Sequence, residues 1–241
     1  MALRIGFDLD GVLADMEEAI VREAVTLFGM TQAAAPEQRQ SASMADLVPD
    51  EVADDAPLRH EVQLTTRQRR QLWRHIRGID GFWESLDEIE AGIVDRLAHT
   101  ADNRRWEIIF LTRRPATAGR TAQVQSQRWL EKKGFRLPSV YVVTASRGLI
   151  ATALTLDIVV DDTPENCVDV ASDSKARTIA IFRNQEKLPP PILNRMGIHI
   201  VDSTAKCLDL LVEIDSSLAQ PQPSRIERVM RTLGLKEPTS V

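Results

Sequence analysis

The sequence predicts an α/β fold: a Rossmann-like parallel sheet with helices on both faces, and a helical cap inserted after the first strand. Short apolar runs recur along the chain, and they are continuous rather than alternating, as in strands buried on both faces. From residue 106 onward these runs alternate with helical stretches, which is the pattern of repeated strand–helix units. The segment 16–90 breaks this rhythm and is expected to be the insertion.

Each element is placed by its own local pattern. Strands are expected at 3–7, 106–111, 140–143, 157–160, 178–182 and 198–201. Helices are expected at 16–28, 66–77, 91–101, 117–133 and 146–154, and Pro164 suits the first turn of a further helix. The predicted domains are a Rossmann-like catalytic core of 1–15 and 91–220, a helical cap of 16–90, and a C-terminal tail of 221–241 that carries a short helix.

Composition argues against several classes of function. The 241 residues are 43% hydrophobic, and their net charge of −5 disfavours binding to nucleic acid or to an anionic membrane. No apolar run approaches the ~20 residues that a membrane span needs. Cys167 and Cys207 form no metal or disulfide motif, and they are expected to be small buried hydrophobes. A reducing, cytoplasmic location is therefore expected.

Two carboxylates, two residues apart, follow the first apolar run. Asp8 and Asp10 precede Gly11, which ends the strand. Because positions i and i+2 of a strand share a face, both are expected to emerge together at the carboxyl edge of the sheet, where ligands bind. Crowded carboxylates repel each other unless a cation or a proton lies between them. The spacing therefore indicates a metal, a nucleophile, or both.

Polar residues follow the other strands at a similar place. The second strand ends in Thr112, Ser146-Arg147-Gly148 follows the third, and Asp161-Asp162 ends the fourth. Because these ends share one edge of a parallel sheet, the groups are expected in one crevice. Such a crevice suits a phosphate ester, since magnesium takes oxygen ligands, one aspartate can attack phosphorus and another can transfer protons. Thr112 and Arg147 can hold the phosphoryl oxygens.

These residues, in this order, resemble motifs of the haloacid dehalogenase-like phosphatases. The resemblance rests on Asp8-Leu9-Asp10-Gly11-Val12, on Thr112 and on Asp161-Asp162, each at the end of a strand, and it covers nearly the whole chain. A closer resemblance is to the 5'(3')-deoxyribonucleotidase-like branch. That resemblance rests on the stretches 10–15, 81–86, 110–115 and 160–166.

The resemblance implies a role for each site residue. Asp8 would be the nucleophile that forms an aspartyl-phosphate, and Asp10 would be the general acid and base. Mg²⁺ would be bound by Asp8, by the backbone carbonyl of Asp10 and by Asp162, with Asp161 as a neighbouring carboxylate. The substrate would be a small phosphorylated molecule, with a 5'-nucleotidase activity on (deoxy)nucleoside monophosphates as the first expectation. A homodimer is compatible with the sequence.

One position departs from the pattern of that family, which carries a lysine ahead of its fourth motif. Arg147 stands there, since Lys132 and Lys133 fall at a helix end and match less well. Arginine keeps the charge but is larger and can bridge two phosphate oxygens. We expect Arg147 to bind the substrate's phosphate, together with Thr112 and Arg113.

Two alternatives stay open at this stage. One is a phosphatase for another small phosphomonoester, and the other is a non-catalytic phosphate- or nucleotide-binding module, which only the arginine at 147 favours. Within the insertion, Trp73, Phe82 and Trp83 could stack on a base or pack the cap, and the basic stretch 67–77 is expected to be a solvated face.

Overall fold

A computed structural model describes residues 2–29, 64–183 and 188–219 of the chain. The chain divides into two compact units, Met1–Cys207 and Leu208–Val241. The first unit contains a six-stranded sheet in the order β3-β2-β1-β4-β5-β6, and each neighbouring pair of strands is parallel. This is the doubly wound order in which the direction of winding reverses between β1 and β4. The predicted Rossmann-like fold is confirmed.

The strands lie within two residues of their predicted positions. They are β1 (Arg4–Asp8), β2 (Glu107–Thr112), β3 (Ser139–Val142), β4 (Ile158–Asp161), β5 (Arg177–Ile181) and β6 (His199–Val201). In the register of the sheet, Phe7 of β1 pairs with Phe110 on one side and with Val160 on the other, and all three are buried. Burial on both faces explains why the central strands β1, β2 and β4 are continuous apolar runs.

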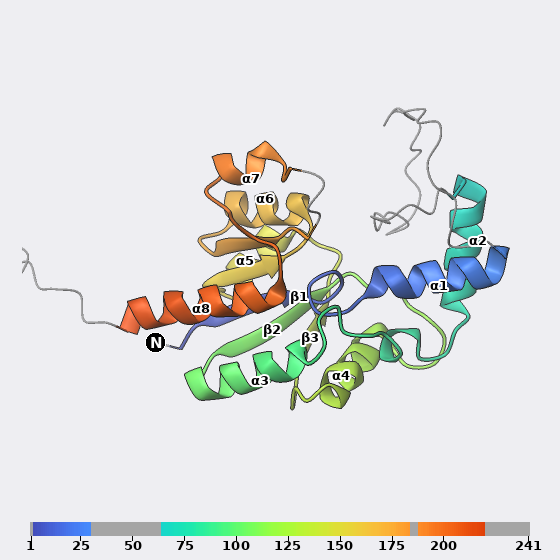
Figure 1. Ribbon diagram of the computed structural model, residues 1–241, viewed down its shortest axis with the longest axis horizontal. Coiled ribbons are helices and arrows are strands. Elements are labelled where there is room, and N and C mark those ends of the chain that lie inside the picture. Colours follow the sequence, from blue (N-terminus) through green and yellow to red (C-terminus); the bar gives the residue numbers. More distant parts are fainter. Residues whose placement is uncertain (1, 30–63, 184–187, 220–241) are drawn as a thin grey trace, which may run out of the picture. The chain divides into compact units, whose positions relative to one another are not determined.

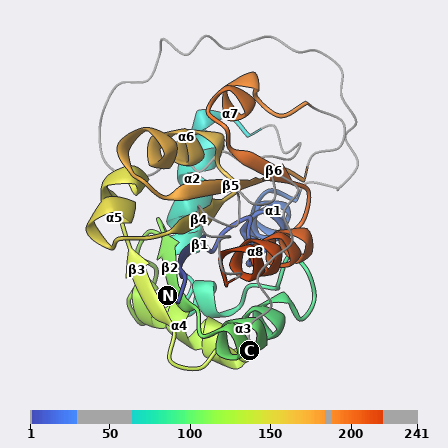
Figure 2. The ribbon, with the colours of Figure 1, turned by 90° about the vertical axis from the view of Figure 1, so that its left-hand side faces the viewer.

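Helices cover both faces of the sheet (Figures 1 and 2). On one face lie α3 (Ile93–Arg104) and α4 (Ala122–Lys132), and on the other lie α5 (Arg147–Ala153) and α6 (Pro164–Asp173), with α7 (Pro191–Arg195) against α6. The helices α5 and α6 close over β2 and β4 with a core of small and aliphatic side chains. That core consists of Ile109, Leu111, Ala151, Leu156, Val159, Val170 and Ala176.

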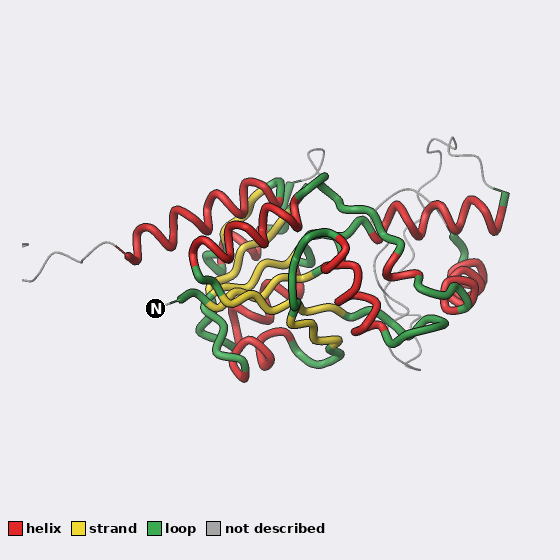
Figure 3. Tube along the Cα trace, turned by 90° about the horizontal axis from the view of Figure 1, so that it is seen from below, coloured by secondary structure: helices red, strands yellow, loops and turns green. Residues whose placement is uncertain are grey.

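Helices of the inserted segment stand beyond the carboxyl ends of the strands (Figures 1 and 3). They are α1 (Met16–Phe28), α2 (Thr66–Arg77) and the short 3₁₀ helix η1 (Phe82–Glu84). The two ends of the segment pair with each other, since the Asp15 amide donates to the Asp87 carbonyl at 2.9 Å and the Ile89 amide to the Leu13 carbonyl at 2.9 Å. Asp15 also caps α1 by accepting from the Glu18 amide.

The predicted domain boundaries stay predictions. Residues 30–63 of the predicted cap and all of the predicted tail, 221–241, lie outside the described residues. The helix α8 (Thr204–Ala219) begins in the first unit and continues into the second.

Several helical elements differ from the sequence prediction, among them α3, which ends at Arg104 rather than at 101. The helices η1, α7 and α8 had not been predicted, and α4 begins at Ala122 rather than at 117. The reason for the late start is that Gln125 holds the preceding residues as a loop, with its side-chain amide donating to the Thr117 hydroxyl at 2.9 Å and to the Arg120 carbonyl at 2.5 Å. Thr121 then caps the helix by accepting from the Val124 amide.

Two compositional predictions can be compared with the described residues. Cys167 and Cys207 are both buried and have kept their thiols rather than forming a disulfide, and burial raises the pKa of the Cys207 thiol. Within the described ranges, no helix combines the length and apolarity that crossing a membrane would require.

Candidate active site

The buried carboxylate of Asp8 lies at the centre of the site. Asp8 is the last residue of β1 and is 7% exposed. One carboxylate oxygen each from Asp8, Asp161 and Asp162 come within 4.8 Å of one another. The end of β1 thus meets the end of the adjacent strand β4, as the parallel sheet order requires.

A negative charge on Asp8 is unfavourable in the protein alone. Burial raises the pKa of Asp8 well above its ordinary value of 3.8, and the neighbouring Asp161 and Asp162 raise it further, while the Arg147 guanidinium acts in the opposite direction. A cation placed among the three carboxylates would offset this penalty.

Local hydrogen bonds fix the two carboxylates at the end of β4. Asp161 accepts from the Thr163 amide at 2.8 Å and from the Asn166 side-chain amide at 3.1 and 3.2 Å, both near the start of α6. Asp162 packs against Gly11, where the backbone has a φ of 80° and a Cβ atom would lie 1.8 Å from Asp162 Oδ2. Only glycine leaves room for Asp162 at this turn.

Arg147 lies where the sequence placed it, at the first position of α5 after the cap residue Ser146. It is 2% exposed, and its Nη2 donates to Asp8 Oδ1 at 2.6 Å, while its Nε lies 3.6 Å from Asp161 Oδ2. Among the described residues, its Nε and Nη1 are buried without a hydrogen-bond partner. Buried guanidinium donors of this kind are costly unless a ligand oxygen accepts from them.

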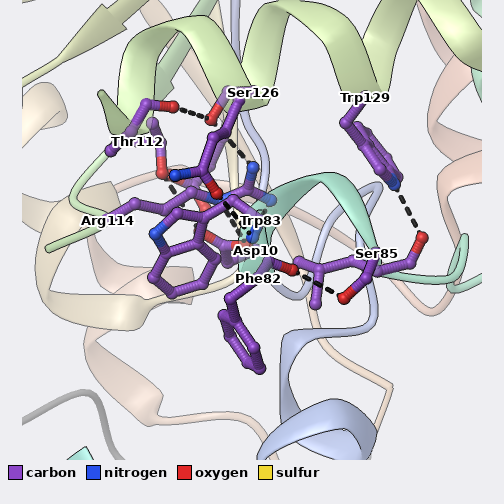
Figure 4. Close-up of polar contacts among 12 residues, drawn as sticks. Asp10, Phe82, Trp83, Ser85, Thr112, Arg114, Ser126 and Trp129 are labelled. Atoms are coloured by element: carbon purple, nitrogen blue, oxygen red, sulfur yellow. Dashed lines mark hydrogen bonds and ion pairs between the residues drawn. The ribbon is translucent and has the colours of Figure 1, made fainter. Parts of the chain in front are cut away.

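Asp10 is held from the neighbouring strand. Thr112, at the end of β2, donates its hydroxyl to Asp10 Oδ2 at 3.0 Å. Arg114 donates from Nη2 to Oδ1 at 2.7 Å and from Nε to both oxygens at 3.0 Å (Figure 4). Asp10 is more accessible than its partner, with 12% of its side chain exposed against 0% for Arg114.

The two arginines that follow β2 have different surroundings. Arg113, the predicted substrate ligand, is exposed, and its role stays a prediction. Arg114, which is not among the predicted site residues, is buried and pairs with Asp10. The one local signal was its position two residues after Thr112, since both residues contact Asp10, although Arg114 already lies in the loop after β2.

The aromatic candidates of the insertion are buried. Trp83, Phe82 and Trp73 are 0%, 2% and 6% exposed, so their rings pack inside the protein. Trp83 donates its ring N–H to the Pro115 carbonyl at 2.9 Å, and its ring lies 5.0 Å from the Arg114 guanidinium carbon.

The donor set of this site fits a hard divalent cation. The side chains of Asp8, Asp161 and Asp162 offer only carboxylate oxygens, which magnesium prefers, and one oxygen of each lies within 4.8 Å of the others. Four carboxylates, counting Asp10, face two guanidiniums, Arg114 and Arg147. If all four are ionised, two negative charges are left, which one divalent cation would balance.

Solved structures with a similar fold include proteins described as hydrolases of the haloacid dehalogenase family. A hydrolase of that family from Deinococcus radiodurans, solved with bound phosphate and sodium, aligns over 88% of this chain and 96% of its own at a TM-score of 0.51 and 15% identity. A putative beta-phosphoglucomutase from Thermotoga maritima aligns over 88% of this chain and 99% of its own, with a TM-score of 0.51 and 17% identity. A hydrolase from Pseudomonas syringae aligns over 89% of this chain and 99% of its own, with a TM-score of 0.50 and 15% identity. No family model and no curated protein matches the sequence.

Proposed function

We propose that this chain is a phosphomonoester hydrolase that depends on a divalent metal and acts through an aspartyl-phosphate on Asp8. The observation that carries the proposal is the convergence of Asp8, Asp161 and Asp162, with Arg147 donating to Asp8. A pure phosphate-binding site has no use for three converging carboxylates, because they repel the ligand. A site that binds a cation and attacks phosphorus needs them.

The first half of the proposed reaction moves the phosphoryl group to the protein. A carboxylate oxygen of Asp8 forms a bond to phosphorus, and the bond from phosphorus to the ester oxygen breaks. The electron pair of that bond goes to the ester oxygen, which takes a proton from Asp10. Arg147 and Thr112 lie beside these two aspartates, where they can hold the phosphoryl oxygens and Asp10, respectively.

The second half returns Asp8 to its starting state. Asp10 takes a proton from water, the water oxygen bonds to phosphorus, and the bond between phosphorus and Asp8 breaks to release inorganic phosphate. Mg²⁺, when bound by Asp8, Asp162 and their neighbours, would neutralise the carboxylates and polarise the phosphoryl oxygens. The hydrolase of similar fold from Deinococcus radiodurans was solved with bound phosphate and sodium, so a protein with this fold can bind both an anion and a cation.

The proposed substrate class is a (deoxy)nucleoside monophosphate, which makes the activity a 5'-nucleotidase. Its support is the resemblance of the stretches 81–86 and 110–115 to the deoxyribonucleotidase-like branch. Base stacking on Trp83 or Phe82 is not part of this proposal, because both rings are buried. The base would be recognised by other residues.

A turnover screen tests both levels of the proposal. Purified protein is assayed for phosphate release from p-nitrophenyl phosphate, mononucleotides and sugar phosphates, with Mg²⁺ and with a chelator. We expect Mg²⁺-dependent turnover, with mononucleotides preferred, and loss of at least about 10³-fold in Asp8→Asn. Turnover confined to sugar phosphates would refute the nucleotidase, and nucleotide binding without any turnover would refute the hydrolase.

A further inference from the structure

Arg114 holds Asp10 with an unusually complete set of contacts. Its side chain is fully buried, and three of its contacts, at 2.7, 3.0 and 3.0 Å, go to the two oxygens of Asp10. Since Thr112 donates to Oδ2 at 3.0 Å, both carboxylate oxygens are restrained from the side of β2. A planar guanidinium that meets a carboxylate through two nitrogens fixes its plane as well as its position.

Arg114 is itself locked in place by three neighbours (Figure 4). Its Nη1 donates to Ser126 Oγ at 2.8 Å, and that hydroxyl donates to the Ala122 carbonyl at 2.7 Å. The rings of Trp83 and Trp129 lie 5.0 and 5.9 Å from its guanidinium carbon, a range in which cation and ring attract. Arg114 therefore has little freedom to turn away from Asp10.

One of these neighbours belongs to the inserted segment. Trp83 lies in η1, its backbone amide donates to the Gln125 side chain at 3.0 Å, and its ring N–H donates to the Pro115 carbonyl at 2.9 Å. The Trp129 ring N–H likewise donates to the Leu86 carbonyl at 2.7 Å. The orientation of Arg114 is thus fixed jointly by the loop after β2, by the helix α4 and by the inserted segment.

We propose that Arg114 is a positioning residue that orients the Asp10 carboxyl toward the leaving-group oxygen of the substrate. The proposal rests on the proposed function, in which Asp10 gives that oxygen a proton. Arg114 does not touch the substrate; it acts through Asp10. Proton transfer requires a fixed hydrogen-bond geometry between the acid and the oxygen, so a loosened Asp10 would slow the cleavage of esters whose leaving group needs the proton.

A pair of substrates separates this role from a merely structural one. Phenyl phosphate and p-nitrophenyl phosphate are nearly the same size, but p-nitrophenolate leaves readily without protonation and phenolate does not. We measure kcat/KM, which reports the steps through cleavage of the ester bond, for the wild type and for Arg114→Gln. Arg136→Gln, an exposed arginine before β3 at the opposite edge of the sheet, is the matched control.

We expect kcat/KM of Arg114→Gln to fall about 10- to 100-fold more for phenyl phosphate than for p-nitrophenyl phosphate, which is part of the 10²–10⁴-fold that general acids supply. Arg114→Lys is expected to have a higher kcat/KM for phenyl phosphate than Arg114→Gln, and Arg136→Gln should leave kcat/KM unchanged for both substrates. Asp10→Asn shows the same discrimination between substrates, and adding Arg114→Gln to it produces no further discrimination, since the two residues act as one unit.

An equal fall for both substrates in Arg114→Gln would overturn the positioning role while leaving the proposed hydrolase intact. Absence of turnover in the wild type would instead refute the proposed function. If Arg114→Gln does not fold, as judged by circular dichroism, the same comparison is made with Arg114→Lys and Trp83→Phe. Trp83→Phe removes the ring N–H that bonds Pro115 and keeps an aromatic face near Arg114, so a smaller discrimination of the same sign is expected, and none would overturn the role.

Discussion

The carboxyl group of Asp8 makes folding sensitive to pH. Its pKa is raised in the folded protein by burial and by Asp161, so above pH 3.8 the unfolded chain releases a proton that the folded chain retains. Stability of the metal-free protein therefore decreases as pH rises from that value through the folded pKa of Asp8. In chelator, Asp8→Asn is expected to melt above the wild type at neutral pH, with the difference shrinking toward pH 4.

Thermal unfolding monitored between acid and neutral pH checks this expectation. Asp102→Asn, at an exposed position on α3, is the control and should follow the wild type. A wild type that melts above Asp8→Asn at neutral pH would mean that the ion pair with Arg147 outweighs the burial of Asp8.

The turn at Gly11 can be tested against a second glycine with the same backbone conformation. Gly11 and Gly92 have φ values of 80° and 74°, but only at Gly11 would a Cβ meet a neighbour, Asp162. Each change to alanine should cost about 1–2 kcal/mol in backbone strain. Gly11→Ala should also weaken Mg²⁺ affinity about 10- to 100-fold, because Asp162 must move. Calorimetric titration that gives equal affinities for the two variants would contradict this.

At the scale of single residues, the sequence predicts which side chains lie close together at the sheet edge, but not which atoms are in contact. Asp8, Thr112, Asp161 and Arg147 could be placed at one edge because each follows an apolar strand. The exposure of Arg113, in contrast, depends on the direction that the chain takes after β2. That direction is determined by contacts with residues far away in sequence, which no local pattern contains.

Two helices hold Arg147 in position through a close backbone contact. At Gly148, the next residue, a Cβ would lie 2.4 Å from the Asp169 carbonyl oxygen on α6. The Asp169 carboxylate in turn accepts from the Ser146 hydroxyl at 2.8 Å and from the Gly148 amide at 3.1 Å. The N-terminus of α5 is therefore pinned against α6.

Gly148→Ala should force α5 and α6 apart. We expect a loss of about 1–3 kcal/mol in stability from overpacking, together with a raised KM, because Arg147 moves with its helix. Ser146→Ala, which removes the cap and the two hydroxyl contacts with the Asp169 carboxylate, should cost about 1 kcal/mol and raise KM less. Denaturant unfolding and steady-state kinetics measure both effects; an unchanged KM in Gly148→Ala would show that Arg147 does not depend on this packing.

Among the elements, strands could be predicted well and helix ends less well. The strands are short apolar runs whose bounds shift by two residues at most. The predicted start of α4 is wrong because the Gln125 side chain donates hydrogen bonds to the loop before the helix. This loop also forms backbone hydrogen bonds with Arg77 and Gly81 of the inserted segment. For α8, the apolar spacing of Cys207, Leu208 and Leu211 was a signal that could have been read as a helix.

For the molecule as a whole, metal binding should be visible as stability. A ligand that binds only the folded state stabilises it by about 2.7 kcal/mol at 100 times its Kd. Mg²⁺ should therefore raise the melting temperature of the wild type, and the gain should diminish at acid pH, where protons compete for the carboxylates. The melting temperature of Asp162→Asn should rise much less on adding Mg²⁺ than that of the wild type. Calorimetric scans with and without Mg²⁺ measure this, and identical gains in both proteins would exclude Asp162 as a ligand.

The topology of the sheet follows from rules that act on the whole chain. Continuous apolar strands joined by helices favour a parallel sheet, and right-handed crossovers leave few orders for the strands. The observed order β3-β2-β1-β4-β5-β6 is one of these. Substrate choice is not determined by this topology, because a fold shared with solved structures at 15–17% identity leaves the chemistry of the site open.

Trapping the covalent intermediate tests the central claim most directly. The protein is mixed with p-nitrophenyl phosphate and Mg²⁺, quenched in acid during turnover, digested and analysed by mass spectrometry. We predict one added phosphoryl group on the peptide that contains Asp8, labile to hydroxylamine as an acyl phosphate is, and absent from Asp8→Asn. Turnover without phosphoryl on Asp8, or with phosphoryl on a different residue, would contradict the assignment of Asp8 as the nucleophile.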